Sequence, residues 1–225
     1  MPTVRYNEEK EQKNQVFLDR KALILNMTMK TCICIAGMPA SGKTTAALRL
    51  SGKLGIAMLS KDEIKEKLFD RIGFQSRQEK VQLGLAAMEI LYYAAERCLA
   101  AGQSVILENN FEDLSRPGLQ ALQERTGCRM ITILFDGETR AVYERFVKRD
   151  QSPFRHRGHV VNDRYPEVGA SAEVKTLSFD AFEQSIEQRG YRRFSIGTLI
   201  PVDCTDPARI DVERLAQQIR ERMDA

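Results

Sequence analysis

The chain has 225 residues, of which 43% are hydrophobic and 29% are charged, and its formal net charge is +3. These values indicate a globular protein of one α/β domain, or two small ones, and they exclude a disordered chain. No apolar run approaches the roughly 20 residues of a membrane span. The mild charge permits anionic substrates but is weaker than the basic patch typical of nucleic-acid-binding proteins.

Residues 1–28 form a mainly polar N-terminal extension that lacks the pattern of a signal peptide. The five cysteines show no metal-ligand spacing, and their odd number is typical of a reduced interior. We therefore predict a cytoplasmic protein whose main domain covers residues 29–225.

A strand, a glycine loop and a helix follow one another within residues 31–50. The apolar run 32–36 predicts a buried parallel strand, and residues 37–44, GMPASGKT, match G-x-x-x-x-G-K-[ST]. The amphipathic run 45–54 predicts the helix that this motif requires. The alternative, an ordinary glycine turn before a helix, does not explain the whole pattern.

The loop residues suit a nucleotide triphosphate. Glycines let backbone amides turn toward phosphate oxygens, and the helix N-terminus adds a positive dipole end. Lys43 can reach the β- and γ-phosphates, and the Thr44 hydroxyl can bind Mg²⁺. The predicted nucleotide contacts are Gly37, Pro39, Ala40, Ser41, Gly42, Lys43, Thr44 and Thr45.

A second short strand is predicted at 56–59, followed by a helix that a Ser60–Glu63 capping box begins and that runs to about Ile72. If this strand flanks the phosphate-loop strand, Asp62 faces the γ-phosphate and can accept a proton from a substrate hydroxyl or position it. The alternative is an acid favoured only by the helix dipole.

A long amphipathic helix is predicted at 77–101, ended by Gly102. Its apolar residues fall on one stripe, which predicts a buried face: Val81, Leu85, Met88, Tyr92 and Ala95.

The third strand, at 104–107, leads into Glu108, Asn109 and Asn110. Glu108 can hold Mg²⁺ or orient a substrate, unless it simply reaches solvent. Asn110 could bind a substrate or form a turn, and Arg116 could meet an anionic group or decorate a helix start.

The remaining chain alternates predicted helices at 115–126, 138–150, 176–188 and 207–223 with predicted strands at 130–135 and 198–203. This order predicts a parallel sheet, whose ligands bind beyond the carboxyl ends of its strands.

Residues 151–169 form a long irregular segment rich in arginine, which is typical of a lid or binding loop. Arg145 and Arg149 lie on one helix face before it, and Arg155 and Arg157 lie within it. Guanidinium groups suit phosphate oxygens, although a solvated basic face is the alternative. His156 and His159 have no partners at metal spacing.

The segments GMPASGKTT, LSKDEI, VILENNF and RFVKRD, with the arginine-rich loop, together resemble the small P-loop kinase family. These AAA-like ATP-binding kinases are related to zeta toxins, chloramphenicol phosphotransferase and the kinase module of polynucleotide kinases. The resemblance covers about residues 30–220. It implies a three-layer P-loop NTPase fold, a five-stranded parallel sheet of order 2-3-1-4-5, and an arginine-bearing lid at about 150–170.

The resemblance also implies residue roles. The family aspartate thought to activate the acceptor hydroxyl matches Asp62, and the lid-helix arginine matches Arg149, with Arg145 one turn earlier. The acid after the third strand is commonly aspartate in the family and is Glu108 here, which leaves its metal role open.

We therefore predict a kinase that uses ATP and Mg²⁺ to phosphorylate a hydroxyl of a small molecule. The open alternatives are a polynucleotide 5′-kinase, a regulatory nucleotide-binding module with slow ATPase activity and, more weakly, a toxin acting on a nucleotide sugar. The predicted catalytic residues are Lys43, Asp62, Arg149, Arg155 and Arg157. Arg145 is predicted to bind the nucleotide, Thr44 and Glu108 the metal, and Glu108, Asn110 and Arg116 the substrate.

Overall fold

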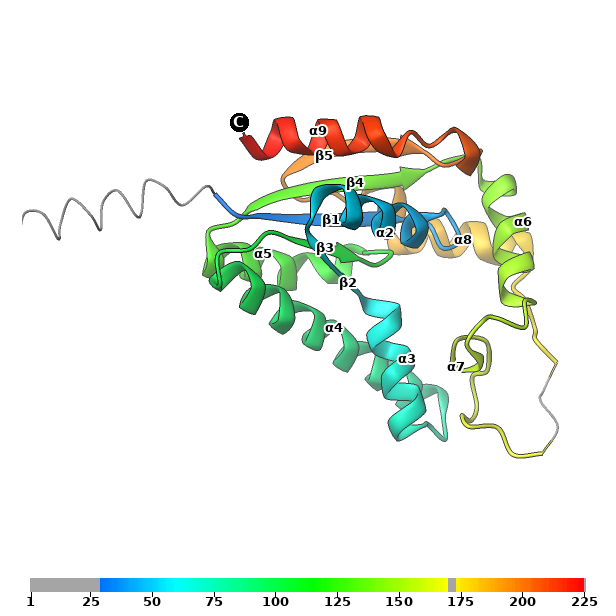
Figure 1. The fold of residues 1–225 in the computed structure, drawn as a ribbon. Helices are drawn as coiled ribbons and strands as arrows, with labels where there is room; N and C mark the ends of the chain where they lie inside the picture. Colours follow the sequence, from blue (N-terminus) through cyan, green and yellow to red (C-terminus); the bar gives the residue numbers. More distant parts are fainter. Residues whose placement is uncertain (1–28, 170–172, 225) are drawn as a thin grey trace, which may run out of the picture.

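The computed structural model describes residues 29–169 and 173–224. Its five strands form one parallel sheet of order β2-β3-β1-β4-β5, which confirms the predicted fold class (Figure 1). The strands are β1 Thr31–Gly37, β2 Ala57–Ser60, β3 Val105–Glu108, β4 Arg129–Asp136 and β5 Thr198–Asp203. The predicted extension, residues 1–28, lies outside the described residues.

The helices follow the predicted order, with ends shifted by a few residues. They are α2 Lys43–Leu54, α3 Lys61–Ile72, α4 Arg77–Ala100, α5 Arg116–Thr126, α6 Thr139–Asp150, α7 Arg157–Val160, α8 Phe179–Arg189 and α9 Val212–Asp224. The predicted start of the last helix at Pro207 is wrong. Pro207–Arg209 is a separate 3₁₀ turn, and the Asp211 carboxylate accepts a bond from the Arg214 amide at the true start of α9.

Strand β1 is buried on both faces because helices cover both sides of the sheet. Ile33 and Ile35 pack in the core that contains α2 and α9 residues, whereas Cys32 and Cys34 pack in the core that contains α4 and α5 residues. Every residue of β1 is buried. The phosphate loop therefore follows a fully buried central strand of the sheet, which gives it a rigid base.

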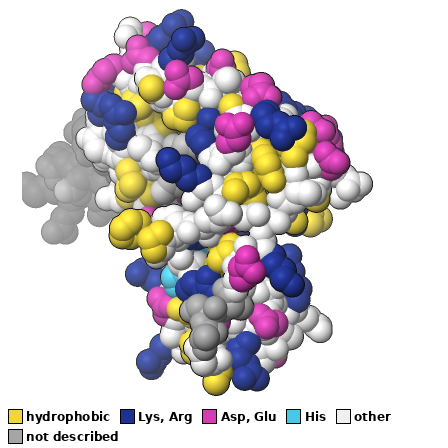
Figure 2. Space-filling view, turned by 90° about the vertical axis from the view of Figure 1, so that its right-hand side faces the viewer, with side chains coloured by type: hydrophobic (Ala, Val, Ile, Leu, Met, Phe, Trp, Pro, Cys, Tyr) yellow, Lys and Arg dark blue, Asp and Glu magenta, His cyan; other side chains and the backbone are white. Residues whose placement is uncertain are grey.

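A third, smaller core lies away from the sheet, between α3 and residues 151–169, which we call the lid segment. Phe69, Phe74 and Val161 are buried there, with Tyr165 packed against them. Phe74 and Tyr165 also exchange backbone hydrogen bonds of 2.8 Å. In Figure 1, α7 lies beside α3 below the sheet, and Figure 2 shows this lobe joined to the main body at a narrow waist.

The predicted buried stripe on α4 is wrong for its first half. Tyr92 and Ala95 are buried against the sheet, but Val81 is 44% exposed and Leu85 is 56% exposed. The reason is length: a helix of 24 residues, at about 1.5 Å per residue, extends well past the four-residue strands β2 and β3. The sheet therefore has no surface left to cover the N-terminal half of α4.

Gly37 ends β1 where the phosphate loop begins, with a φ of 127°. A Cβ atom there would lie 2.1 Å from the carbonyl oxygen of Phe135 on β4. We expect Gly37→Ala to lower the free energy of unfolding by at least about 3 kcal/mol, measured by urea denaturation, because both the clash and the backbone conformation disfavour a side chain.

The matched control is Gly127→Ala, because Gly127 also has a positive φ, 63°, but has nothing within 4 Å of an added Cβ. It should lower the unfolding free energy by only about 1–2 kcal/mol. Equal losses in the two variants would contradict the close approach of β1 and β4 as the cause.

Candidate active site

The phosphate loop forms one wall of a 470 Å³ cavity at the carboxyl ends of the strands. The cavity gathers residues from the loop, α3, β3, α6 and the lid segment, at the place where parallel sheets bind ligands. Its lining is Ala40, Ser41, Gly42, Lys43, Thr44, Thr45, Ser60, Asp62, Glu63, Glu66, Glu108, Asn110, Arg145, Arg149 and Arg155.

Lys43 is folded back into its own loop. Its side-chain ammonium donates to the Met38 carbonyl at 2.6 Å and to the Ser41 hydroxyl at 3.3 Å, and the residue is only 5% exposed. Burial lowers the pKa of Lys43 to about 8, although Glu108 opposes this shift. The ammonium is thus mostly charged at neutral pH and held at the cavity wall, where it can pair with an anion.

Glu108 lines the same cavity as Lys43 and is also only 5% exposed. It accepts hydrogen bonds from the Ser60 hydroxyl at 2.8 Å and the Thr44 hydroxyl at 3.2 Å. Burial raises the pKa of Glu108, while Lys43 opposes that shift. A buried carboxylate beside a hydroxyl oxygen is a donor set that suits Mg²⁺, which prefers oxygen ligands and gains stability from a nearby negative charge.

Within the described residues, no group of three or more His, Cys, Asp or Glu side chains could hold a metal ion by itself.

Asp62 enters the cavity from the first turn of α3. The condition that β2 flanks β1 is not met, since β3 lies between them. The carboxylate nevertheless lines the same cavity as Lys43. Burial opposes its ionisation, yet His159, Lys61 and Arg155 outweigh that effect and hold the pKa of Asp62 at about 2. Asp62 is therefore ionised throughout the physiological range.

The three arginines that line the cavity have different partners. Arg145 donates to the carbonyls of Ala40, Cys204 and Thr205 at 3.3, 2.6 and 2.8 Å, so it ties α6 to the phosphate loop and to the end of β5. Arg149 pairs with the adjacent Asp150 at 2.8 Å.

Arg155 is held only loosely by carboxylates, with Asp150 at 3.8 Å and Asp62 at 4.0 Å. Its Nε is buried and has no hydrogen-bond partner within the described part of the chain. A buried donor of this kind can bind an anion that enters the cavity.

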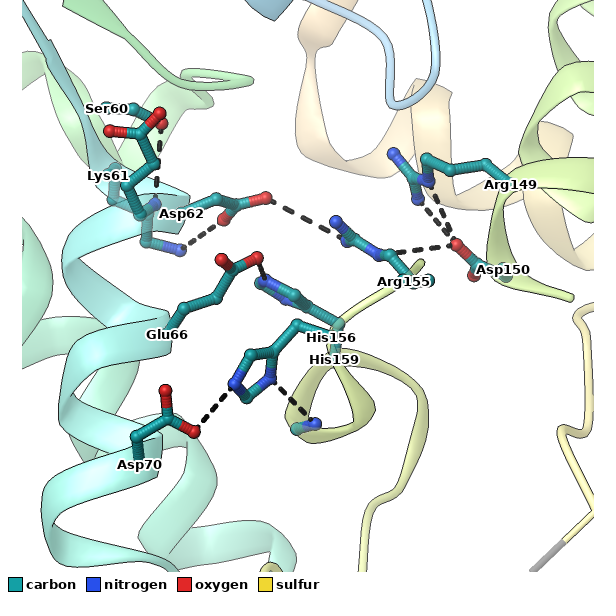
Figure 3. A network of polar contacts seen from close by, with 12 residues as sticks. Ser60, Lys61, Asp62, Glu66, Asp70, Arg149, Asp150, Arg155, His156 and His159 are labelled. Carbon is teal, nitrogen blue, oxygen red and sulfur yellow. Dashed lines mark hydrogen bonds and ion pairs between the residues drawn. The ribbon is translucent and has the colours of Figure 1, made fainter. Parts of the chain in front are cut away.

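A row of acids on α3 holds the lid segment in place (Figure 3). Asp62, Glu66 and Asp70 are spaced four residues apart, so they share one helix face. Glu66 pairs with His159 at 2.8 Å and Asp70 with His156 at 2.9 Å. Glu66 and Asp70 were not among the predicted site residues, although the spacing of four residues between successive acids was a usable signal.

The other predicted site residues lie outside this lining. Arg157 forms a two-bond pair with Glu167, at 2.6 and 2.7 Å. Arg116 donates to the Ser195 and Arg193 carbonyls at 2.6 and 3.2 Å. Gly37 and Pro39 belong to the loop but not to the cavity wall.

Solved structures of kinases share the fold of this chain. A candidate kinase from Chloroflexus aurantiacus J-10-fl is 31% identical to the chain, with a TM-score of 0.71, covering 86% of this chain and 98% of that one. The APS kinase CysC of Mycobacterium tuberculosis, in complex with AMPPNP and APS, shares the fold at 14% identity, a TM-score of 0.53, and coverage of 88% and 99%.

A gluconokinase from Sinorhizobium meliloti 1021 also shares the fold, at 15% identity, a TM-score of 0.50, and coverage of 86% of this chain and 98% of that one. No curated protein matches the sequence. Among the described residues, no helix is both long and apolar enough to cross a membrane.

The sheet order and the phosphate loop define a P-loop protein of the kinase type. A sequence profile described as an AAA domain matches residues 33–165, which is more than half of the chain. The chain belongs to this AAA-domain family of small P-loop kinases.

The buried His159 makes stability depend on pH. Burial lowers the pKa of His159, although its bond to Glu66 opposes the shift. The folded protein therefore resists protonation at a pH where the unfolded chain, with a histidine pKa of about 6.5, accepts a proton. We expect the free energy of unfolding to fall as the pH drops below about 6.5, and to fall less in His159→Gln.

Urea titrations between pH 5.5 and 8.5 measure this difference. Above about pH 7.5, where a histidine with an ordinary pKa is already neutral in both states, the two proteins should share one pH dependence. Identical slopes below pH 6.5 as well would show that His159 titrates alike in the folded and unfolded chains.

Proposed function

We propose that this protein is an ATP-dependent kinase that transfers the γ-phosphate to a hydroxyl of a small-molecule acceptor. The observation that carries the proposal is a single cavity lined by a buried lysine, a half-exposed ionised aspartate and an under-bonded arginine, Lys43, Asp62 and Arg155. Phosphoryl transfer requires cations around the migrating group and an acceptor for the attacking hydroxyl.

The loop residues would bind the phosphate tail. Residues 40–45 line the cavity, so backbone amides of the loop and the N-terminus of α2 would bind phosphate oxygens, with the charge of Lys43 beside them. Thr44 and Glu108 would hold Mg²⁺, which supplies charge neutralisation on the phosphates when bound. Glu108 accepts hydrogen bonds from the Thr44 and Ser60 hydroxyls, which orient its carboxylate.

Asp62 would orient the acceptor hydroxyl for in-line attack. A carboxylate with a pKa of about 2 is a weak base but a permanent hydrogen-bond acceptor. That suffices because the transition state of phosphoryl transfer is loose, so the proton leaves late and positioning dominates the rate.

Arg149 and Arg155 would stabilise the transferred group. Both guanidinium groups line the cavity, and Asp150 lies between them as a shared anchor. Because Arg155 is carried by the lid segment, its position also helps to exclude water, which would otherwise compete as acceptor.

Asp62→Asn tests the proposal. The change keeps the shape but removes the charge that orients the hydroxyl, so we expect kcat for transfer from γ-labelled ATP to fall by about 100- to 10,000-fold. ATP affinity, measured by calorimetry, should stay near that of the unchanged protein, because Asp62 lies on α3 rather than in the loop.

The matched control is Asp180→Asn, which removes an exposed carboxylate in the first turn of α8, outside the cavity lining. It should retain most of the transfer. Lys43→Ala should abolish nucleotide turnover altogether. If Asp62→Asn loses ATP affinity without a separate loss in kcat, its assigned role is wrong.

Glu108→Gln tests the metal role. Glutamine can still accept a hydrogen bond from Ser60 or Thr44 but has no charge for Mg²⁺, so the Mg²⁺ concentration for half-maximal activity should rise about 10- to 100-fold. Glu96→Gln, which removes a surface carboxylate paired with Arg125, serves as the control and should leave that concentration unchanged. An unchanged Mg²⁺ requirement in Glu108→Gln would remove Glu108 from the metal site.

A further inference from the structure

A second cavity, of 800 Å³, lies beside the first and is not used by the mechanism above. It is bounded by α3, α4 and the segment that follows β3, and Asn110 lines both cavities. Its volume is that of a typical small-molecule site. The two cavities therefore meet at Asn110, on the side of the first cavity that the acceptor would occupy.

One side of this cavity is cationic. Lys61 and Lys65 are one helical turn apart on α3, and Arg77 joins them from the start of α4. Like charges at this spacing repel each other and destabilise the helix. Burial lowers the pKa of Lys65 to about 8, and Lys61 adds to the effect.

These cations are poorly neutralised by the protein. Within the described residues, no carboxylate lies within 4 Å of the Lys65 ammonium, and the Lys61 ammonium reaches only Asp62, at 3.9 Å. Arg77 donates to the Asn162 side-chain oxygen, which carries no charge. A ligand anion at this place would relieve the repulsion and raise the pKa of Lys65.

The rest of the lining is mixed. Its carboxylates are those of Glu89, Glu112 and Asp113, of which the last two pair with arginines, and its other residues include an apolar patch. Val81 and Leu85 of α4 face it with 44% and 56% exposure, and Leu114, on the segment after β3, is 86% exposed. Val81 and Leu85 are the α4 residues whose spacing predicted burial and which no part of the sheet covers. Apolar side chains left exposed beside a cavity of cations form a surface that suits a partly apolar, anionic molecule.

We propose that the acceptor is a small amphipathic anion, a hydroxyl-bearing carboxylate or phosphate ester, whose anionic group binds Lys61 and Lys65 and whose apolar part packs on Val81 and Leu85. This inference rests on the proposed kinase function. The acceptor oxygen forms a bond to the γ-phosphorus while the bond between that phosphorus and the ADP oxygen breaks. The hydroxyl proton passes by way of Asp62 to solvent, and the products are a phosphate ester and ADP.

The aromatic residues of this cavity argue against an oligonucleotide. Tyr92, Phe111 and Tyr191 are 7%, 0% and 4% exposed, so they offer no open face on which a base could stack. Proteins that bind single strands depend on such stacking platforms together with a basic groove.

The first experiment measures transfer from γ-labelled ATP by the full chain. The acceptors are the acidic and neutral fractions of a metabolite extract, and an oligonucleotide with a free 5′-hydroxyl. Labelled product should arise from the acidic fraction. The Lys61→Gln/Lys65→Gln variant should lower this product at least tenfold at limiting acceptor, whereas Lys67→Gln, an exposed lysine on α3 outside the cavity, should not. Product from the neutral fraction or the oligonucleotide alone would overturn the inference.

The second experiment does not depend on catalysis. Fluorescence titration with 8-anilinonaphthalene-1-sulfonate, an apolar anion, is made with the nucleotide site saturated by a non-hydrolysable ATP analogue. Affinity should fall at least tenfold in Lys61→Gln/Lys65→Gln and in Leu85→Ser, but not in Lys67→Gln. Equal affinity in all variants would overturn the inference. If neither fraction is phosphorylated but dye affinity still follows these residues, the kinase function is wrong and the ligand chemistry of the cavity stands.

Discussion

The site depends on two buried side chains of opposite charge that line one cavity. Lys43 and Glu108 are each only 5% exposed, and taking an ion out of water costs several kcal/mol even in a relaxed protein. Hydrogen bonds offset this cost. Lys43 donates to Met38 and Ser41, and Glu108 accepts from Ser60 and Thr44. Charges held in this way need little reorganisation when a metal and a phosphate arrive, which is what electrostatic catalysis requires.

The same principle explains how the lid segment is attached. Its small core with α3 contains three buried apolar side chains among the described residues, Phe69, Phe74 and Val161. The acids of α3 supply the rest through pairs with His159, His156 and Arg155. The pair that faces the cavity, Arg155 with Asp62 at 4.0 Å, is the longest of the three, so the attachment is weakest where a ligand would enter.

The features that were predictable from the sequence are those encoded locally. The phosphate loop, the five strands and most helix ends follow from glycines, apolar runs and capping residues that lie close together in the chain. The pairing of side chains far apart was not predictable: Arg157 pairs with Glu167 across the lid segment, and Arg116 reaches the carbonyl of Ser195. An arginine in the sequence shows that a cation exists, but only the fold decides whether a carboxylate or a carbonyl of the protein already accepts its hydrogen bonds.

The prediction for the exposed half of α4 failed for a different reason. Periodicity identified Val81 and Leu85 correctly as members of one apolar face, and the error was to assume that the protein itself covers that face. Tyr92 and Ala95, on the same stripe, are buried because the sheet reaches them. Val81 and Leu85, nearer the start of α4, border a cavity that Lys61 and Lys65 also line. An amphipathic helix that extends past its sheet must either expose apolar surface or share it with something else. Among the residues that the structure describes, the Lys61 and Lys65 ammonium groups have no carboxylate within hydrogen-bonding distance, which favours a ligand over solvent as that partner.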